Sequence, residues 1–204
     1  MDSAYWGGRS VFITGHTGFK GAWLCVLLNR LGARIHGYAL ETPETFLFHR
    51  AGISETLASD VRGDIRDSDA VARAIAASGA EIVLHLAAQT VVRESYRDPR
   101  ESFSVNVDGT LSVLEAAHAT DAVSRVVVVT TDKVYRNNEW VWGYREIDHL
   151  GGDDPYSCLF YTTYAADDLL CVDLGGCRSI KKTTRSHRCT PQRLLTVWRP
   201  RLLR

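Results

Sequence analysis

The chain has no long apolar run, because its longest, residues 22–28, is far shorter than the roughly 20 residues that span a bilayer. No charged segment precedes an apolar stretch at the N-terminus, so no secretory signal is predicted. The five cysteines are odd in number and lack CxxC spacing, which argues against a disulfide framework or a zinc site. We therefore expect a soluble, cytoplasmic protein without a metal ion or a membrane partner.

Neither sign of charge prevails over the 204 residues, which carry 24 Lys and Arg against 24 Asp and Glu. The balance conceals two unlike parts: residues 1–157 carry 15 basic and 21 acidic residues, and residues 158–204 carry 9 and 3. A split from −6 to +6 is typical of a basic arm for nucleic acid or membrane, or of two segments of different origin. Four of the five cysteines also lie after residue 157. We expect two segments of different origin and no nucleic-acid partner.

The composition, 45% hydrophobic and 24% charged, is that of a globular protein. Strands are predicted at residues 10–14, 33–38, 60–67 (with a polar turn), 81–86 and 125–131, and helices at 19–32, 68–78 and 99–119. Weaker patterns suggest a helix at 156–174 and a strand at 194–198. The four consecutive valines of the fifth strand suit a strand covered on both faces. This order predicts an α/β domain with a doubly wound, parallel, Rossmann-like sheet.

A glycine-rich turn joins the first predicted strand to the first long helix. It has the pattern GxxGxxG and consists of Gly15, His16, Thr17, Gly18, Phe19, Lys20 and Gly21. Glycines let the backbone approach a pyrophosphate, and the helix N-terminus aims N–H groups at the anion. The turn lacks the GK[ST] ending of a P-loop. Its position predicts a dinucleotide site, the alternative being tight-turn packing.

Polar residues follow the other predicted strands. Asp64 is placed to bind an adenine edge, or is a solvated turn carboxylate. No acid ends the second strand, and Glu41 comes late for a ribose hydroxyl, so spacing leaves NAD and NADP open. His85 is interpreted as a packed strand residue. Asn106, a poor helix former, has a helix-distorting, ligand-linked or capping role.

The fifth strand ends in Thr131, Asp132 and Lys133, and Tyr156 lies further along the chain. Ionisable groups that leave a buried strand together are candidates for proton transfer, although a surface turn would also explain an Asp-Lys pair. The loop at residues 139–146, rich in Trp, Tyr and Arg, could contact a ligand.

Several phrases resemble a known family. They are TGHTGFKGAWL, GDIRD, HLAAQTVVRESYRDP, NVDGT, VVVVTTDKVY, WVWGYRE and GGDDPYS, and they cover about residues 9–157. The chain resembles the extended short-chain dehydrogenase/reductase superfamily, within it the sugar-nucleotide epimerases and dehydratases, and most closely the CDP-glucose 4,6-dehydratases. Related dehydratases usually have Asp-Glu where this chain has Asp132-Lys133.

The resemblance implies NAD-dependent conversion of CDP-glucose to a 4-keto-6-deoxy sugar. It implies that Tyr156 removes the 4-hydroxyl proton, that Lys133 and Asp132 act as base and acid in the loss of the C6 hydroxyl, and that Thr131 holds the substrate. NAD would contact the glycine turn, Asp64, Ile65, Leu86, Ala87, Ala88, Asn106 and Tyr156. A homodimer is also implied, as is a role in bacterial deoxysugar and lipopolysaccharide synthesis.

The resemblance ends at residue 157. Phe160 occupies the lysine position of the family's YxxxK motif and supplies no positive charge. We therefore expect an NAD-binding domain at residues 1–157, a divergent basic tail at 158–204 that a frameshift would explain, a missing substrate domain and impaired activity. An authentic basic tail that binds an acidic partner is the alternative for the tail. Another sugar-nucleotide epimerase or dehydratase, or a non-catalytic dinucleotide-binding module, are the alternatives for function.

Overall fold

A computed structural model describes residues 3–145, 147–157 and 177–179. Its strands form one sheet in the order β3-β2-β1-β4-β5-β6. They are β1 (Ser10–Thr14), β2 (Arg34–Ala39), β3 (Ser59–Arg62), β4 (Ile82–His85), β5 (Arg125–Val129) and β6 (Cys177–Ser179). The first five are parallel, and β6 pairs with β5 in the antiparallel direction. The predicted Rossmann-like sheet is confirmed.

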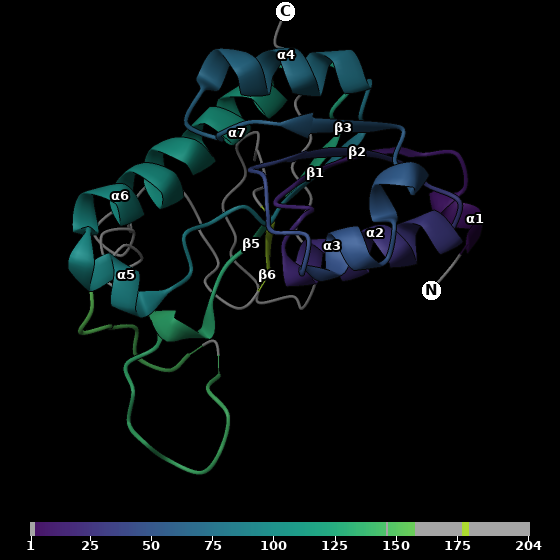
Figure 1. The fold of residues 1–204 in the computed structure, drawn as a ribbon. Coiled ribbons are helices and arrows are strands. Elements are labelled where there is room, and N and C mark those ends of the chain that lie inside the picture. Colours follow the sequence, from purple (N-terminus) through teal and green to yellow (C-terminus); the bar gives the residue numbers. More distant parts are fainter. Residues whose placement is uncertain (1–2, 146, 158–176, 180–204) are drawn as a thin grey trace, which may run out of the picture.

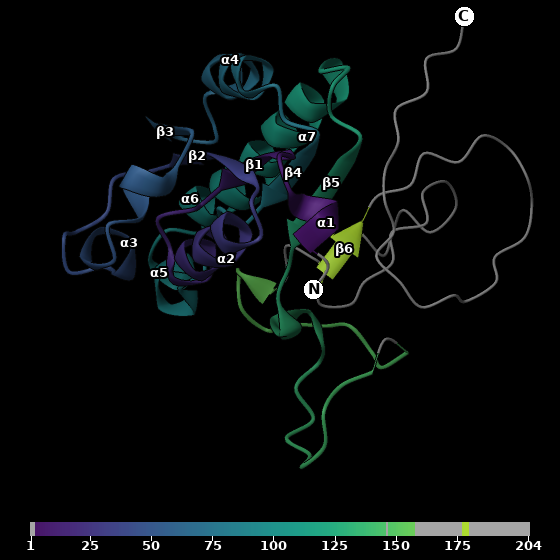
Figure 2. The same ribbon diagram turned by 90° about the vertical axis from the view of Figure 1, so that its right-hand side faces the viewer.

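Helices cover both faces of the sheet (Figure 1). One layer contains α1 (Ser3–Trp6), α2 (Phe19–Arg30), α3 (Leu47–Arg50) and the 3-10 turn η1 (Ile53–Thr56). The other contains α4 (Ser68–Ser78) and α7 (Gly109–Ala119), which pack against each other. Figure 2 shows these layers end-on. The remaining short elements are α5 (Val92–Arg97), α6 (Pro99–Phe103), the π turn η2 (Ser104–Asp108) and the 3-10 turn η3 (Asp132–Val134).

The apolar core follows the strand pleat. Val11 and Ile13 of β1 pack with Ala22 and Cys25 of α2, whereas Phe12 packs with the α4 and α7 layer. Successive side chains of a strand point to opposite faces, so one short apolar strand contributes to both halves of the core. The prediction for β5 holds only in part, because Val126 is buried but its neighbours are half-buried. Beyond β5, the described sheet continues only with the three residues of β6.

The long helix predicted at residues 99–119 is interrupted. It begins as α6, passes through the π turn η2 and continues as α7. Two contacts coincide with the interruption. The Asn106 side chain bonds to the backbone of Gln89, and Gly109 lies so close to Ile65 that a Cβ would stand 2.6 Å from its Cδ1. Such π turns occur often at functional sites.

A long loop follows η3 and extends away from the sheet (Figures 1 and 2). Tyr135 and Leu150 form an isolated bridge at its base. Within it, the rings of Tyr135 and Tyr144 stack at 5.3 Å, and Trp140 contacts Tyr144. No helix in the described part of the chain is long and apolar enough to cross a membrane. The predicted helix at 156–174, apart from its first two residues, and the predicted strand at 194–198 lie outside the described residues.

Candidate active site

The sheet reverses its strand order at β1, whose neighbours are β2 on one side and β4 on the other. In open α/β sheets, ligands bind beyond the carboxyl ends of the strands at such a switch point. A cavity of about 970 Å³ lies there. It is lined by Gly15, Thr17, Gly18, Phe19, Lys20, Gly21, Asp64, Ile65, Leu86, Ala87, Ala88, Asn106, Thr131, Asp132, Lys133 and Tyr156, among others. The structure thus brings together every predicted site residue except the His16 side chain.

Two glycines shape the turn between β1 and α2. Gly15 has a φ of +71°, and a Cβ on it would stand 2.7 Å from the Ala87 nitrogen. A Cβ on Gly21 would stand 2.2 Å from the Gly15 carbonyl oxygen. Gly18, the N-cap of α2, has no side chain to cover the helix N-terminus. The backbone is therefore open to an anion at the helix N-terminus, which fits the pyrophosphate of a dinucleotide.

The His16 side chain does not line the cavity. Its ring is fully buried and lies against Gly37, with Nε2 2.9 Å from Asp60 Oδ1 and 3.0 Å from an Arg62 guanidinium nitrogen. Burial lowers the pKa of His16, with Asp60 opposing the change. The imidazole therefore joins the glycine turn to β3, and contact with a cofactor remains a prediction for the His16 backbone only.

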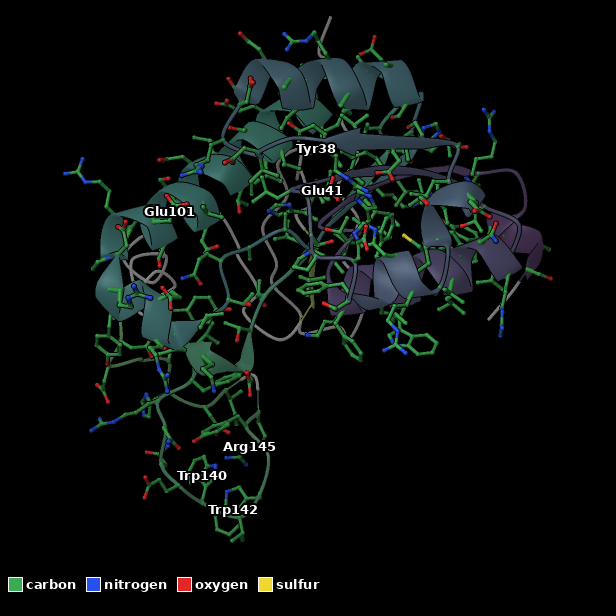
Figure 3. The ribbon with its side chains drawn as sticks, in the orientation of Figure 1. Tyr38, Glu41, Glu101, Trp140, Trp142 and Arg145 are labelled. Atoms are coloured by element: carbon green, nitrogen blue, oxygen red, sulfur yellow. The ribbon has the colours of Figure 1, made fainter. Side chains whose placement is uncertain are left out.

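Asp64 and Arg66 line the cavity at the β3–α4 turn, and the buried Tyr38 supports this turn from the core. The Tyr38 hydroxyl donates to the Asp64 carbonyl at 3.0 Å. The Arg66 guanidinium holds the Asp64 carboxylate and reaches Glu101 of α6 at 2.6 Å. The hydrogen bond from Arg66 lowers the pKa of Asp64. Figure 3 shows Glu101 on the helical side and Tyr38 over the sheet.

Arg66 is a site residue that sequence reasoning missed. Its place two residues after Asp64 was a local signal, because an arginine at that spacing can reach the carboxylate of a turn. Its second partner, Glu101, is distant in sequence and had no such signal.

Thr131, Asp132 and Tyr156 meet at the β5 end of the cavity. Thr131 Oγ1 accepts from the Lys133 amide at 3.3 Å and donates to Asp132 Oδ1 at 3.3 Å, which fixes η3. Tyr156 is 7% exposed, and its phenol hydrogen-bonds with Thr131. Burial raises the pKa of Tyr156, the Thr131 bond lowers it, and Asp132 and Asp154 raise it further. The Tyr156 phenol therefore lines the cavity together with Thr131, Asp132 and Lys133.

His85 is packed within the sheet, as predicted. It is 2% exposed, with ring nitrogens 2.6 Å from Thr14 Oγ1 and 3.0 Å from Thr110 Oγ1. Burial lowers its pKa from 6.5 to about 4, so the ring is neutral at neutral pH. In the described part of the chain, no cluster of three or more His, Cys, Asp or Glu could hold a metal ion.

A family model described as GDP-mannose 4,6 dehydratase matches residues 12–161, which include the whole cavity. The chain belongs to this dehydratase family. It is 47% identical over 158 residues to the CDP-glucose 4,6-dehydratase of Salmonella typhimurium strain LT2, an alignment that covers 77% of this chain and 44% of that protein. The predicted membership among sugar-nucleotide dehydratases is confirmed.

Solved structures agree with this family. The dTDP-glucose 4,6-dehydratase DesIV of Streptomyces venezuelae, a double mutant with NAD bound, aligns with a TM-score of 0.61 and 27% identity over 74% of this chain and 48% of its own. The UDP-glucose-4-epimerase of Stenotrophomonas maltophila has the same fold, with a TM-score of 0.66 and 24% identity over 78% and 47%. The chain spans less than half the length of these dehydratase and epimerase relatives.

Proposed function

We propose that this chain is an NAD-dependent CDP-glucose 4,6-dehydratase sequence whose activity is impaired by the residues from Cys158 onward. One observation carries the proposal. The phenol of Tyr156 hydrogen-bonds with Thr131 in the cavity that the glycine turn also lines. The Tyr156 phenol, which can transfer a proton, and the glycine turn, which can bind a dinucleotide, therefore line the same cavity.

The residues present fit NAD. Gly15 and Gly21 leave no room for side chains where the turn approaches its neighbours. Lys20 adds a cation to the cavity lining, and Asp64, also in the lining, is held by Arg66. NAD, when bound, would accept and return a hydride. The solved structures of DesIV and of the epimerase contain bound NAD, which supports this choice.

The polar wall supplies the proton transfers of a dehydration. Tyr156 would take the proton of the sugar 4-hydroxyl, with Thr131 holding the same oxygen. Lys133 in its neutral form would accept the C5 proton, and Asp132 in its protonated form would give a proton to the departing C6 hydroxyl, which leaves as water. Asp132 and Lys133 are adjacent on η3, so one short turn presents an acid and a base to one substrate.

CDP-glucose is the substrate that we favour. Lys133 stands where related dehydratases usually have Glu, and the relative at 47% identity is a CDP-glucose 4,6-dehydratase. Trp140, Trp142 and Arg145 project on the loop beyond η3 (Figure 3). A different sugar nucleotide is the alternative substrate. NAD and sugar nucleotides are metabolites of the cytoplasm, where the enzyme would act.

The missing lysine is one reason for proposing low activity. Phe160 offers no cation to favour a tyrosinate, while burial, Asp132 and Asp154 raise the pKa of Tyr156. Tyr156 is thus protonated at neutral pH and is a poor base. A non-catalytic dinucleotide-binding module is the functional alternative. We expect Phe160→Lys alone to leave turnover well below normal, because the other residues from Cys158 onward still depart from the family pattern. Near-normal turnover in this variant would contradict that expectation.

Two assays test the proposal. The chain as it stands is titrated with NAD by calorimetry and then incubated with NAD and CDP-glucose, with Tyr156→Phe as the control. Binding with weak, Tyr156-dependent formation of a 4-keto-6-deoxy product supports the proposal. Binding without turnover favours the module. A version with the family's YxxxK continuation restored is then given CDP-, dTDP-, GDP- and UDP-glucose, and preference for a donor other than CDP-glucose contradicts the substrate.

We also propose that residues 1–157 and 158–204 have different origins. The family phrases end at Ser157, and residues 158–161, to which the family model extends, lack the lysine of the motif. Translation of the encoding DNA in its other two frames tests a frameshift: a continuation resembling SASK is expected in one of them. Its absence from both would leave an authentic basic tail.

A homodimer is proposed through the α6–α7 helices. Phe103, Val107 and Leu111 follow one another at four-residue spacing and are 42%, 45% and 51% exposed. A stripe of large apolar side chains on a helix surface is typical of a subunit contact. Sedimentation of the chain should give a dimer, and Leu111→Glu should give a monomer. A monomeric parent at micromolar concentration would contradict the proposal.

A further inference from the structure

One carboxylate organises the turn that carries Tyr156. Asp154 Oδ1 accepts hydrogen bonds from the Tyr156 amide at 2.9 Å and from the Ser157 amide at 3.0 Å. Asp154 Oδ2 accepts a short hydrogen bond from the Ser157 hydroxyl. An aspartate that binds the amides two and three residues ahead fixes the backbone of a turn, because it satisfies donors that would otherwise need other partners.

The same turn is attached to the polar wall of the cavity. The Gly151 amide donates to the Val134 carbonyl at 2.9 Å, which joins the turn to the end of η3. Gly152 lies against Ser157 so closely that a Cβ on Gly152 would stand 1.8 Å from the Ser157 Cβ. The backbone on both sides of Asp154 is therefore held, and the carboxylate closes the last part of the turn.

We propose that Asp154 is a positioning residue that holds the Tyr156 phenol at Thr131 through the backbone of this turn. The inference rests on the proposed function, in which Tyr156 transfers a proton. Asp154 makes no described contact with Thr131 and binds the Tyr156 backbone instead, so its effect on the phenol is indirect. Tyr156 follows Pro155, whose fixed φ limits the conformations open to the turn.

Asp154 acts on Tyr156 in two separable ways. Its hydrogen bonds place the residue, and its negative charge contributes to the raised pKa of the phenol. Asparagine retains an oxygen that can accept from both amides but lacks the charge. Alanine loses both effects. The pair of variants therefore separates geometry from electrostatics.

The experiment follows the Tyr156 phenol by ¹⁹F NMR in the full chain labelled with 3-fluorotyrosine. Tyr156→Phe assigns the resonance, and its chemical shift and titration midpoint are recorded for Asp154→Asn and Asp154→Ala. We expect Asp154→Asn to keep the chemical shift and lower the midpoint. We expect Asp154→Ala to move both the chemical shift and the midpoint toward those of an exposed 3-fluorotyrosine, whose ring fluorine makes its phenol more acidic than that of tyrosine. Asp153→Ala, at an exposed neighbouring carboxylate, should change neither quantity.

Parental values of both quantities in Asp154→Ala would overturn the proposal. If Asp154→Ala does not fold, Asp154→Asn decides: because asparagine keeps the oxygen that accepts from both amides, a resonance shifted to the exposed position in this variant contradicts the positioning role. An unchanged midpoint would contradict only the charge effect. Titration with NAD separates this inference from the proposed function. A chain that fails to bind NAD while its Asp154 variants behave as expected would overturn the function and keep the positioning role.

Discussion

The side-chain amide of Asn106 pairs with both backbone groups of Gln89. Asn106 Oδ1 accepts from the Gln89 amide at 2.8 Å, and Asn106 Nδ2 donates to the Gln89 carbonyl at 2.9 Å. Gln89 follows β4, and Asn106 lies in the π turn η2. Asn106 therefore pairs with the Gln89 backbone much as a residue of a neighbouring strand would. It links the loop beyond β4 to the π turn that lines the cavity.

Removal of the Asn106 amide should destabilise the fold. Asn106→Ala leaves two part-buried backbone groups without their partner, at a cost of about 1–3 kcal/mol in the free energy of unfolding. Asn106→Asp should cost at least as much, because a carboxylate oxygen would face the Gln89 carbonyl. Gln89→Ala is the comparison: it keeps the backbone pair and loses only the exposed side-chain bonds of Gln89 to Val91, so it should cost less than Asn106→Ala. Denaturant unfolding measures all three, and equal stability of Asn106→Ala and Gln89→Ala would contradict the role of the pair.

Gly21 should tolerate no side chain. A Cβ at this position would stand 2.2 Å from the Gly15 carbonyl oxygen, so α2 or the glycine turn must move. We expect Gly21→Ala to reduce stability by more than about 1 kcal/mol and to abolish NAD binding. Gly143→Ala, whose Cβ would meet no atom within 4 Å, is the matched control. Thermal unfolding and NAD titration check the pair, and parental behaviour of Gly21→Ala would refute the close approach.

Features encoded in neighbouring residues were predictable from the sequence. The β1 strand, the glycine turn and α4 were found at their observed places, because apolar periodicity and turn glycines act locally. The inward direction of the His16 ring was not predictable, since it depends on Asp60 and Arg62 of β3, which are distant from His16 in sequence.

The sequence indicates the π turn η2 only as one alternative, a helix-distorting role for Asn106. Asn106 was recognised as a poor helix former, but its partner is the backbone of Gln89, and backbone groups leave no trace in residue type. Side-chain and backbone contacts between distant segments account for both differences.

Stability should fall in mild acid because of His85. Burial lowers the pKa of His85 to about 4. Between pH 6.5 and 4, His85 therefore binds a proton in the unfolded chain but not in the folded chain. The free energy of unfolding therefore decreases as the pH falls from 6.5 to 4, by about 3 kcal/mol for this residue. His16 and His36, whose pKa values are also lowered by burial, act in the same direction.

His85→Gln tests the assignment. It should flatten the pH dependence of the urea midpoint between pH 6.5 and 4, relative to the parent. His118→Gln, in which an exposed histidine of α7 is replaced, should retain the parental slope. An unchanged slope in His85→Gln would show that other groups cause the acid sensitivity.

The carboxylates around Arg62 should disfavour NADP. Its guanidinium lies 2.9 Å from Glu41 and 2.7 Å from Asp60, so two carboxylates oppose one cation beside the ends of β2 and β3. A 2′-phosphate would meet a net negative charge there. We expect Glu41→Gln to raise NADP affinity by about fivefold relative to NAD. Glu44→Gln, at an exposed neighbour, is the control, and equal effects of the two variants in calorimetric titrations would reject this explanation.

The central claim is that NAD binds in the cavity that the glycine turn and Tyr156 both line. The most direct test is a titration of the fluorotyrosine-labelled 204-residue chain with NAD, observed at the Tyr156 resonance. We predict a saturable change in that resonance, which adenosine alone does not reproduce in full because it lacks the nicotinamide half. A Tyr156 resonance that stays unchanged up to millimolar NAD would contradict the account.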